Sequence, residues 1–382
     1  MTFSSDVQQI FKPGDVSQLC EILHSAEHVL PIGGQTKSAF AAPASSCQLV
    51  DCQQLSGIVT YDPSEFLITA RSGTSLKEIC LALQANGQYL PFDPLLVESG
   101  STLGGTIAAG LSGSCRLLYG GLRDFVMAIE FVDGLGQVVC GGGKVVKNAA
   151  GFDFPKLLIG SYGRLGIITE ATIKVLPSPQ AWGTLVTQFQ SLPQALKIVR
   201  RWMSLPLPIA AADIDANADE VKVYMRIAGL RSSLAGVFER LKGQLPQTSQ
   251  ATAMDAEVER HFWHDRSKLG YGLFETTEGF GVRAAMPAQQ VEEFQRSLTE
   301  QELAKQTVYT SGGAVAWLTI SGDHVEALDG QLKGMGLSAV VTAGTRELLP
   351  LGNCTWIPVA SRIQTAIDPQ RKFLPYPQAT VF

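Results

Sequence analysis

The segment Gly100–Gly113, GSTLGGTIAAGLSG, is the part of the sequence that says most about the fold. It opens a glycine-rich region, Gly100–Gly166, in which 16 of 67 residues are glycine. Average proteins contain about 7% glycine, and a higher density weakens helices and strands. A protein keeps such a density where its backbone approaches a ligand closely or takes positive φ, or where it makes tight turns. The motifs around this stretch favour a backbone that binds a large ligand.

The overall composition limits the class of protein. The 382 residues are 45% hydrophobic and 17% charged, which is ordinary for a soluble globular protein. The net charge of −5 and the lack of a Lys/Arg cluster argue against a nucleic-acid surface. No run of about 18 apolar residues is present, and the N-terminal MTFSSDVQQI lacks the features of a signal peptide. We therefore expect a cytoplasmic protein without a transmembrane segment, which reaches a membrane only peripherally, through partners.

The seven cysteines predict neither a disulfide framework nor a metal site. A chain of this size needs no disulfides, so the odd number favours reduced thiols. Cys47 and Cys52 form the closest pair, and no CxxC motif occurs. We therefore expect no iron–sulfur cluster and no structural zinc in this chain.

A compositional shift divides the chain. All five tryptophans lie beyond residue 180, whereas six of the seven cysteines precede residue 141. Leu176–Gln180, LPSPQ, lies between these regions and contains two prolines. We place a domain boundary there, with residues 1–176 as the first domain and residues 177–382 as the second.

Short α/β units are predicted in the first domain. Asp15 with Gln18, and Ser75 with Glu78, have the spacing of helix-capping residues, and apolar residues follow each pair at helical spacing. Asn86-Gly87 stops the second of these helices. The expected strands are Val29–Ile32, Leu49–Val50, Phe66–Ala70, Ala128–Val132 and Val138–Cys140.

An antiparallel α+β pattern is predicted in the second domain. Residues 221–227 alternate between apolar and polar, as in a half-buried strand. Further strands are expected at Gly183–Phe189, Phe280–Met286 and Ala314–Ile320, and helices at Pro193–Met203, Ser233–Lys242 and Ala288–Ala304. His324 is expected to start a helix.

The segment Pro31–Lys37, PIGGQTK, is a candidate anion site. Gly33 and Gly34 allow successive N–H groups to face one concavity, which suits a phosphate, although a surface turn has the same composition. It is not a P-loop, because Thr36 precedes Lys37 where that motif needs glycine. Gly141–Lys144 also fails, since Val145 follows the lysine. Gly134-Leu-Gly136 lacks the third glycine of a dinucleotide fingerprint and is expected to be a hairpin turn.

Four motifs in order resemble the FAD-binding domain (PCMH-type) of the vanillyl-alcohol oxidase superfamily. They are Gly33-Gly34, Thr102–Gly105, Tyr119–Asp124 and Gly160–Thr169. Within that superfamily the chain is similar to GlcE-type subunits of glycolate dehydrogenase. The segments that carry this second similarity are Leu111–Arg116, Val145–Asp153, Glu259–His264 and Phe280–Arg283. The resemblance implies an α+β fold, with a two-part PCMH-type FAD-binding domain followed by an antiparallel α+β cap. It leaves open whether the C-terminal tail returns to the FAD-binding domain.

The resemblance also implies a flavin site. The pyrophosphate would be held by Ile32, Gly33, Gly34, Gln35, Thr36 and Lys37. The ribityl chain and its phosphate would be lined by Ser101, Thr102, Gly104, Gly105 and Ala108. Pro91 and Asp93 would lie near the isoalloxazine or on the loop approaching it. Backbone groups of Gly110, Gly163, Gly166 and Ile168 would contact the adenosine or the ring. Covalent attachment in this superfamily uses His or Cys, and no His is near Gln35–Lys37, so we expect non-covalent FAD.

The sequence offers one candidate metal site and one candidate substrate-binding residue. His261 and His264 have a spacing that suits a metal, but the resemblance implies that they belong to a helix of the substrate domain, so we expect no metal. Arg283 is a candidate for binding a substrate carboxylate, because a guanidinium suits bidentate contacts, although an exposed strand charge fits equally well.

The implied activity is the FAD-dependent oxidation of a small 2-hydroxy acid, glycolate, to glyoxylate. The sequence identifies no catalytic base. By resemblance, a larger flavoprotein subunit and an iron–sulfur subunit accompany this chain and receive its electrons. Two alternatives stay open: an FAD-binding accessory or assembly subunit without its own active site, and a stand-alone D-lactate-type dehydrogenase.

Overall fold

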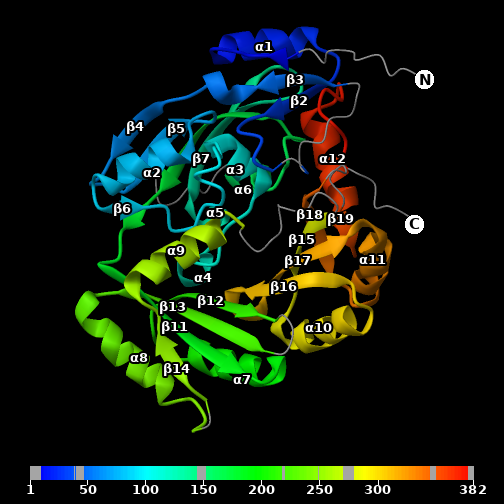
Figure 1. Ribbon diagram of the computed structural model, residues 1–382. Coiled ribbons are helices and arrows are strands. Elements are labelled where there is room, and N and C mark those ends of the chain that lie inside the picture. Colours follow the sequence, from blue (N-terminus) through cyan, green and yellow to red (C-terminus); the bar gives the residue numbers. More distant parts are fainter. Residues whose placement is uncertain are drawn as a thin grey trace.

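The computed structural model describes residues 10–37, 39, 47–143, 152–216, 220–247, 249–269, 279–344 and 350–376. Helices and mainly antiparallel sheets alternate along the chain, so the α+β class is confirmed. In Figure 1 the N-terminal part lies at the top and the largest sheet lies at the bottom. The segment Val145–Asp153, which carried part of the resemblance, lies outside the described residues except for Phe152 and Asp153.

The described strands of the first part form two main sheets. A small parallel sheet has the order β1-β3-β2, and a larger antiparallel sheet has the order β4-β5-β9-β7-β8. A short antiparallel pair joins β10 to β6. The bounds are β1 Ile10–Phe11, β2 Val29–Ile32, β3 Gln48–Asp51, β4 Ile58–Asp62, β5 Leu67–Arg71, β6 Gln88–Tyr89, β7 Val126–Val132, β8 Val138–Gly142, β9 Ile167–Lys174 and β10 Leu176–Pro177.

Side-chain caps start the first two helices as the sequence predicts. The Asp15 carboxylate accepts a hydrogen bond from the Gln18 N–H at 2.9 Å, and the Ser75 hydroxyl accepts one from the Glu78 N–H at 3.1 Å. The described helices of this part are α1 Val16–Ser25, α2 Leu76–Gln84, α3 Leu103–Ala109, α4 Arg116–Tyr119, α5 Leu122–Phe125 and α6 Phe154–Leu158. A 3₁₀ turn, η2, covers Cys52–Gln54.

The segment between β7 and β8 is a hairpin. Val132 pairs with Val138, and the Asp133 carboxylate accepts hydrogen bonds from the N–H groups of Leu135 and Gln137, both at 2.9 Å. Gly136 takes φ +74°, a conformation that favours glycine. These glycines therefore form a turn, as expected, and not a dinucleotide fingerprint.

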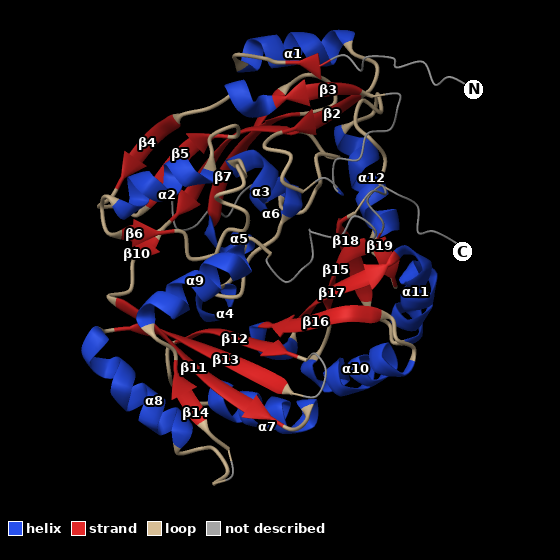
Figure 2. Ribbon diagram, viewed as in Figure 1, coloured by secondary structure: helices blue, strands red, loops and turns tan. Residues whose placement is uncertain are grey.

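A large antiparallel sheet forms the second part (Figure 2). Among the described residues, nine strands follow the order β14-β11-β13-β12-β16-β17-β15-β18-β19. Their bounds are β11 Ala181–Phe189, β12 Ile209–Asp215, β13 Val221–Gly229, β14 Ala251–Ala253, β15 Gly279–Ala285, β16 Ala304–Thr310, β17 Val315–Ser321, β18 Ser338–Ala343 and β19 Pro350–Gly352.

The helices of the second part confirm two predicted helices and shorten a third. They are α7 Leu192–Met203, α8 Leu234–Lys242, α9 Ala256–Ser267, α10 Val291–Glu300, α11 Val325–Gly334 and α12 Ile357–Ile367 in the described chain. The helix predicted to reach Ala304 ends at Glu300, because Glu302 turns to φ +51° and Ala304 begins β16. His324 is the residue immediately before α11, as expected.

The two faces of the large sheet have different neighbours. One face packs against α7, α8, α10 and α11, and this core includes Trp202, Phe294 and Leu328. The opposite face meets the first part of the chain, where Trp317 packs with Leu96, Ala109 and Leu111. In Figure 1, α4, α5 and α9 lie between the sheet and the first part. The second face therefore contributes side chains to the space between the two parts.

The end of the chain returns to the first part. Phe373 forms a parallel bridge with Val29 of β2. The Gln364 amide of α12 donates hydrogen bonds to the carbonyl oxygens of Arg164 at 2.8 Å and Leu374 at 2.7 Å. Because β10 ends at Pro177 and β11 starts at Ala181, we propose the domain boundary within Leu176–Gln180.

Candidate functional site

The loop after β2 presents free main-chain donors. β2 ends at Ile32, and the loop Gly33–Lys37 follows it. Within the described part of the chain, the N–H groups of Gly34, Gln35, Thr36 and Lys37 donate no hydrogen bond. Successive unpaired N–H groups in a loop form a concavity that attracts an anion.

The glycines of this loop are required by close packing of two loops. A Cβ on Gly34 would lie 1.9 Å from the carbonyl oxygen of Gly100, and a Cβ on Gly33 would lie 2.5 Å from Thr102 Oγ1. The positive φ belongs instead to Gln35, at +50°. The loop of Gly33 and Gly34 therefore packs directly against the segment Gly100–Thr102.

The Thr102–Gly105 motif forms the first turn of helix α3. Thr102 caps this helix by accepting a hydrogen bond from the Gly105 N–H at 3.3 Å. The N–H groups of Leu103 and Gly104 donate to the carbonyl oxygens of Thr74 and Ser72. These amides are therefore used within the protein, which leaves the loop after β2 as the source of free donors.

Gly105 has a different role from the one that its glycine-rich context suggests. Positive φ is one general reason for a high density of glycine, but Gly105 lies inside α3 and does not take positive φ. A Cβ on Gly105 would meet only Thr102 Oγ1, at 3.0 Å, and its other side is open toward a cavity. Gly104, in contrast, packs against Ser72, whose Cβ would lie 2.7 Å from an added Cβ.

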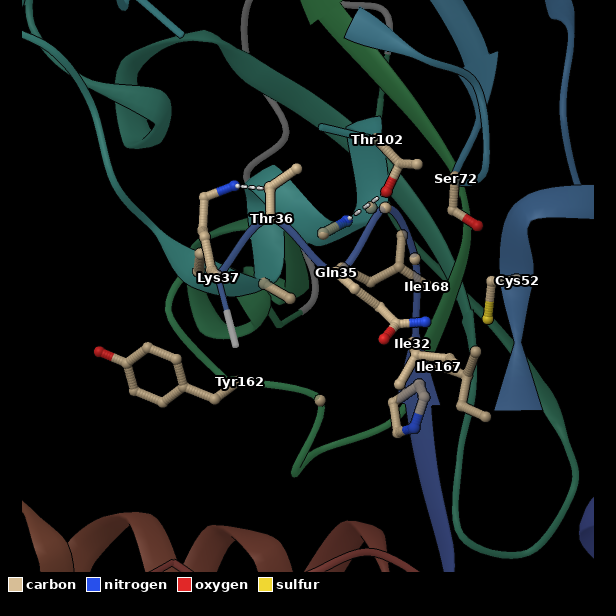
Figure 3. Close-up of a pocket in the computed structure, with 18 of the residues that line it drawn as sticks. Ile32, Gln35, Thr36, Lys37, Cys52, Ser72, Thr102, Tyr162, Ile167 and Ile168 are labelled. Atoms are coloured by element: carbon tan, nitrogen blue, oxygen red, sulfur yellow. Dashed lines mark hydrogen bonds between the residues drawn. The ribbon is translucent and has the colours of Figure 1, made fainter. Parts of the chain in front are cut away.

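One cavity brings together most of the predicted cofactor residues (Figure 3). Its lining includes the predicted residues Ile32, Gly33, Gly34, Gln35, Thr36, Lys37, Thr102, Gly104, Gly105, Ala108, Gly163, Gly166 and Ile168. Small residues and loop amides follow one another along this lining. Such a surface suits a long dinucleotide, whose phosphates need donors and whose remaining length needs close backbone approach.

The cavity also includes residues that were not among the predicted cofactor residues, although some of them lie within the predicted motifs. They are Pro31, Cys52, Ser72, Ala109, Tyr162 and Ile167. The Ser72 hydroxyl is buried and has no hydrogen-bond partner among the described residues, so it remains available to a ligand. Burial raises the pKa of the Cys52 thiol to about 12, so this group is neutral at physiological pH. The Ser-Gly-Thr-Ser run before α2 was the available sequence signal for Ser72.

Four predicted cofactor residues lie elsewhere. The Ser101 hydroxyl is buried and accepts a hydrogen bond from Lys37 Nζ at 3.2 Å, so it supports the lining. Gly110 lines a second cavity. Pro91 and Asp93 line neither cavity, and the Asp93 carboxylate accepts a hydrogen bond from the Cys115 N–H at 2.9 Å.

The second cavity adjoins the first and is rich in arginine. The two share Ala109 and Tyr162 as lining residues. The charged side chains around the second cavity are Arg116, Arg123, Asp124 and Arg283. Asp124 Oδ2 accepts a hydrogen bond from the Gly121 N–H at 2.9 Å, so this carboxylate already caps α5. The cavity therefore has an excess of positive charge.

Strand alternation places Arg283 at this cavity. Phe280, Val282 and Ala284 of β15 belong to the core on the outer face, so Arg283 points to the opposite face. Its guanidinium carbon lies 6.0 Å from the centroid of the Trp317 ring, and Nε is buried without a hydrogen-bond partner among the described residues. Burial, together with the charge of Arg116, lowers the pKa of Arg283 to about 10, so it stays protonated at neutral pH. A half-buried guanidinium whose Nε has no hydrogen-bond partner among the described residues favours an anionic ligand.

The histidine pair lies away from this region of arginines. His261 and His264 are on α9, and no group of three His, Cys, Asp or Glu side chains converges in the described part of the chain. The cysteines of the described chain are all free thiols. None of the described helices is long and apolar enough to cross a membrane.

Comparison with known proteins identifies the cofactor and the family. The family model "FAD binding domain" matches residues 7–141, so the chain is an FAD-binding flavoprotein. The glycolate oxidase subunit GlcE of Escherichia coli (strain K12) is 34% identical over 289 residues, which is 76% of this chain and 75% of that protein. The chain therefore belongs to the GlcE family of oxidoreductase subunits with a PCMH-type FAD-binding fold. The free donors of Gly34–Lys37 and the open side of Gly105 fit FAD.

Other relatives match shorter segments. The glycolate oxidase subunit GlcD of Bacillus subtilis (strain 168) is 29% identical over 202 residues, 52% of this chain and 43% of that protein. A D-lactate dehydrogenase of Anaerostipes hadrus is 32% identical over 151 residues, 40% of this chain and 31% of that protein. The chain thus spans less than half the length of these two relatives. Their names support FAD-dependent oxidation of hydroxy acids as the general activity of this group.

The fold is shared with solved structures at low sequence identity. An alkyldihydroxyacetonephosphate synthase superimposes with a TM-score of 0.71 and 16% identity, covering 97% of this chain and 77% of that protein. At this identity the likeness establishes the fold alone.

Proposed function

We propose that this chain is the FAD-binding subunit of an enzyme that oxidises glycolate to glyoxylate and passes the electrons to a partner protein. The observation that carries the proposal is the adjacency of the two cavities. The first fits FAD, and Ala109 and Tyr162 line both cavities. The second is lined by Arg283, whose Nε has no hydrogen-bond partner in the described part of the chain. A carboxylate held at Arg283 therefore lies beside the proposed cofactor site.

The chain's own residues bind and orient the substrate in this proposal. Oxidation of glycolate removes a hydride from the carbinol carbon and a proton from its hydroxyl group. Bound FAD supplies the hydride acceptor. Arg283 would hold the substrate carboxylate in a charge-assisted contact, and Arg116 lines the same cavity as a second guanidinium. Tyr162, at the junction, contributes to both walls.

A second candidate function is favoured by the lack of an evident proton acceptor. Apart from the arginines, the titratable side chains that line the second cavity in the described chain are Asp124 and Tyr162. Asp124 caps α5, and burial raises the pKa of Tyr162. This supports the alternative that the chain is an accessory or electron-carrying subunit, and that a larger flavoprotein subunit performs the oxidation.

The proposed partners are a larger flavoprotein subunit and an iron–sulfur subunit. Two relatives are named as separate glycolate oxidase subunits, GlcE and GlcD, which supports a multi-subunit enzyme. No cluster-binding set of cysteines converges within the described residues. The proposed electron route therefore leaves this chain for another protein, and we propose that any membrane association is peripheral and occurs through these partners.

The test compares the isolated chain with the co-expressed complex. Each sample, with its FAD, is mixed with glycolate or D-lactate without oxygen, and the flavin absorbance near the visible maximum is followed. Bleaching of the isolated chain by glycolate supports its own active site, whereas bleaching in the complex alone supports the accessory function. Bleaching of the isolated chain by D-lactate but not glycolate would establish a D-lactate-type dehydrogenase. Acid precipitation of the same samples should release the FAD, because we propose non-covalent binding.

A further inference from the structure

Lys37 is a buried ammonium group that contacts only neutral partners. Its side chain is 8% exposed, and Nζ donates hydrogen bonds to Thr36 Oγ1 and Ser101 Oγ, both at 3.2 Å. The Ser101 hydroxyl in turn donates to the carbonyl oxygen of Leu95 at 3.2 Å. Both hydroxyls accept hydrogen bonds from the ammonium group without neutralising its charge. Figure 3 shows the contact with Thr36.

No carboxylate of the described residues forms an ion pair with Lys37. Among the described residues, Lys37 is the only charged residue that lines the cavity. The adjoining sequence, residues 38–46, contains no Asp or Glu. The other titratable groups of the lining are Cys52 and Tyr162, and burial raises the pKa of both, so they are neutral.

The position of Lys37 indicates where the missing negative charge comes from. Lys37 belongs to the same loop as the free N–H groups of Gly34, Gln35 and Thr36. A buried charge without a partner is costly, whereas the same charge beside a phosphate forms a strong contact. The pyrophosphate of FAD brings negative charge to a cavity whose lining, as described, carries none.

We propose that binding of FAD is coupled to the uptake of a proton by Lys37, because among the described residues this buried side chain has only neutral hydrogen-bond partners until the pyrophosphate is bound. The proton goes to Nζ, which changes from an amine to an ammonium as the dinucleotide binds. This inference rests on the assignment of the first cavity to FAD. It adds that the cofactor itself provides the counter-charge of a residue built into the site.

The consequence is a pH-dependent affinity for FAD. Burial lowers the pKa of Lys37 to about 8, and the bound pyrophosphate should raise it again. Below pH 7 both forms of the protein carry the ammonium, so affinity should be constant. Between the two pKa values the affinity should fall by about tenfold for each pH unit.

The experiment measures proton uptake directly. Flavin-free protein is titrated with oxidised FAD in a calorimeter, at pH 6.5, 8 and 9, in two buffers with different ionisation enthalpies. At pH 8 we expect uptake of about half a proton per FAD, with less at pH 6.5 and more at pH 9. The readout is a proton count, which does not depend on catalytic activity.

Three variants separate this mechanism from a structural role. Lys37→Arg keeps a charge that does not titrate in this range, so it should bind FAD without proton uptake. Lys37→Met should also show no uptake and should bind about 10- to 100-fold more weakly at pH 7. The control, Lys77→Met, removes an exposed lysine on α2 and should behave as the unmodified protein.

The outcomes distinguish this inference from the proposed function. FAD binding with no proton uptake at pH 8 and 9 would overturn the inference and leave the cofactor site in place. Uptake that persists in Lys37→Met would also overturn it, because another group would then be titrating. Failure of the unmodified protein to bind FAD at any pH would instead overturn the assignment of the cavity.

Discussion

The two adjoining cavities are built in different ways. The first is lined by loop amides, hydroxyls and glycines, and Lys37 is its one charged lining residue in the described chain. The second is surrounded by side chains with charge, namely Arg116, Arg123, Asp124 and Arg283. A backbone-lined cavity depends on the exact course of the chain, whereas a side-chain-lined cavity depends on individual charged groups. Single substitutions should therefore affect the two cavities differently.

The largest expected effect comes from a substitution that separates the two loops of the first cavity. Gly34→Val would place Cβ 1.9 Å from the carbonyl oxygen of Gly100. This clash is with a main-chain atom, which cannot move aside as the end of a flexible side chain could. We expect loss of FAD and a decrease of roughly 3 kcal/mol or more in the free energy of unfolding. Flavin absorbance after purification and denaturant unfolding provide the measurements. Retention of FAD with unchanged stability would contradict this packing.

A second substitution should remove FAD while leaving the fold intact. The open side of Gly105 faces the first cavity, so Gly105→Val should fill space that the dinucleotide requires. We expect flavin content to fall from about one FAD per chain to less than a tenth of that, with cooperative unfolding retained. Gly236→Val is the matched control, because Gly236 lies in helix α8 with open space around it. Equal flavin content in both variants would show that Gly105 serves only the helix.

The opposite behaviour is expected in the second cavity. Arg283→Met should retain FAD, because Arg283 does not line the first cavity. We expect the KM for glycolate of the assembled enzyme to rise by about 10- to 100-fold, since a charge-assisted contact is lost. Arg200→Met, on the exposed face of α7, is the control. An unchanged KM would show that the substrate carboxylate does not bind to Arg283.

The smallest expected effect concerns the stability of the flavin-free protein. Burial lowers the pKa of Lys37 to about 8, so the unfolded chain binds more protons than the folded chain between this value and the ordinary lysine pKa of 10.5. Flavin-free protein should therefore gain stability as pH rises through that interval. Lys37→Met should remove this dependence and raise stability at pH 7 by roughly 1–3 kcal/mol. Lower stability of the variant at pH 7 would show that the ammonium group supports the empty fold.

Local signals in the sequence predicted much of the fold. The capping pairs at Asp15 and Ser75 located α1 and α2, because a cap is a contact between neighbours in the chain. The turn at Asp133–Gly136 was predictable for the same reason. Strand β16 was missed, because its first residue, Ala304, continues the apolar pattern of the preceding helix. Only the turn at Glu302 separates the helix from the strand.

The candidate site was predictable where a motif supplies the backbone. The loop Gly33–Lys37 and the Thr102–Gly105 motif lie on the same cavity, as the resemblance implied. Ser72 was missed, because it reaches the cavity through tertiary packing of a segment outside the motifs. Tyr162 lies within the motif Gly160–Thr169, but the sequence did not show that this residue lines the cavity. Arg116 was missed for a related reason: its association with Arg283 depends on how α4 and β15 meet.

The return of the chain end to β2 sets an order of events during protein synthesis. Phe373 bridges Val29, and Gln364 holds the carbonyl oxygen of Arg164, although more than 150 residues separate the members of each pair. The N-terminal part therefore emerges from the ribosome before the segment that pairs with β2 has been synthesised. The cofactor-binding part therefore cannot form these contacts until the whole cap has been synthesised. A fragment that stops near residue 176 would lack this closing segment, and we expect the chain to acquire FAD only after residues 364–373 have been synthesised.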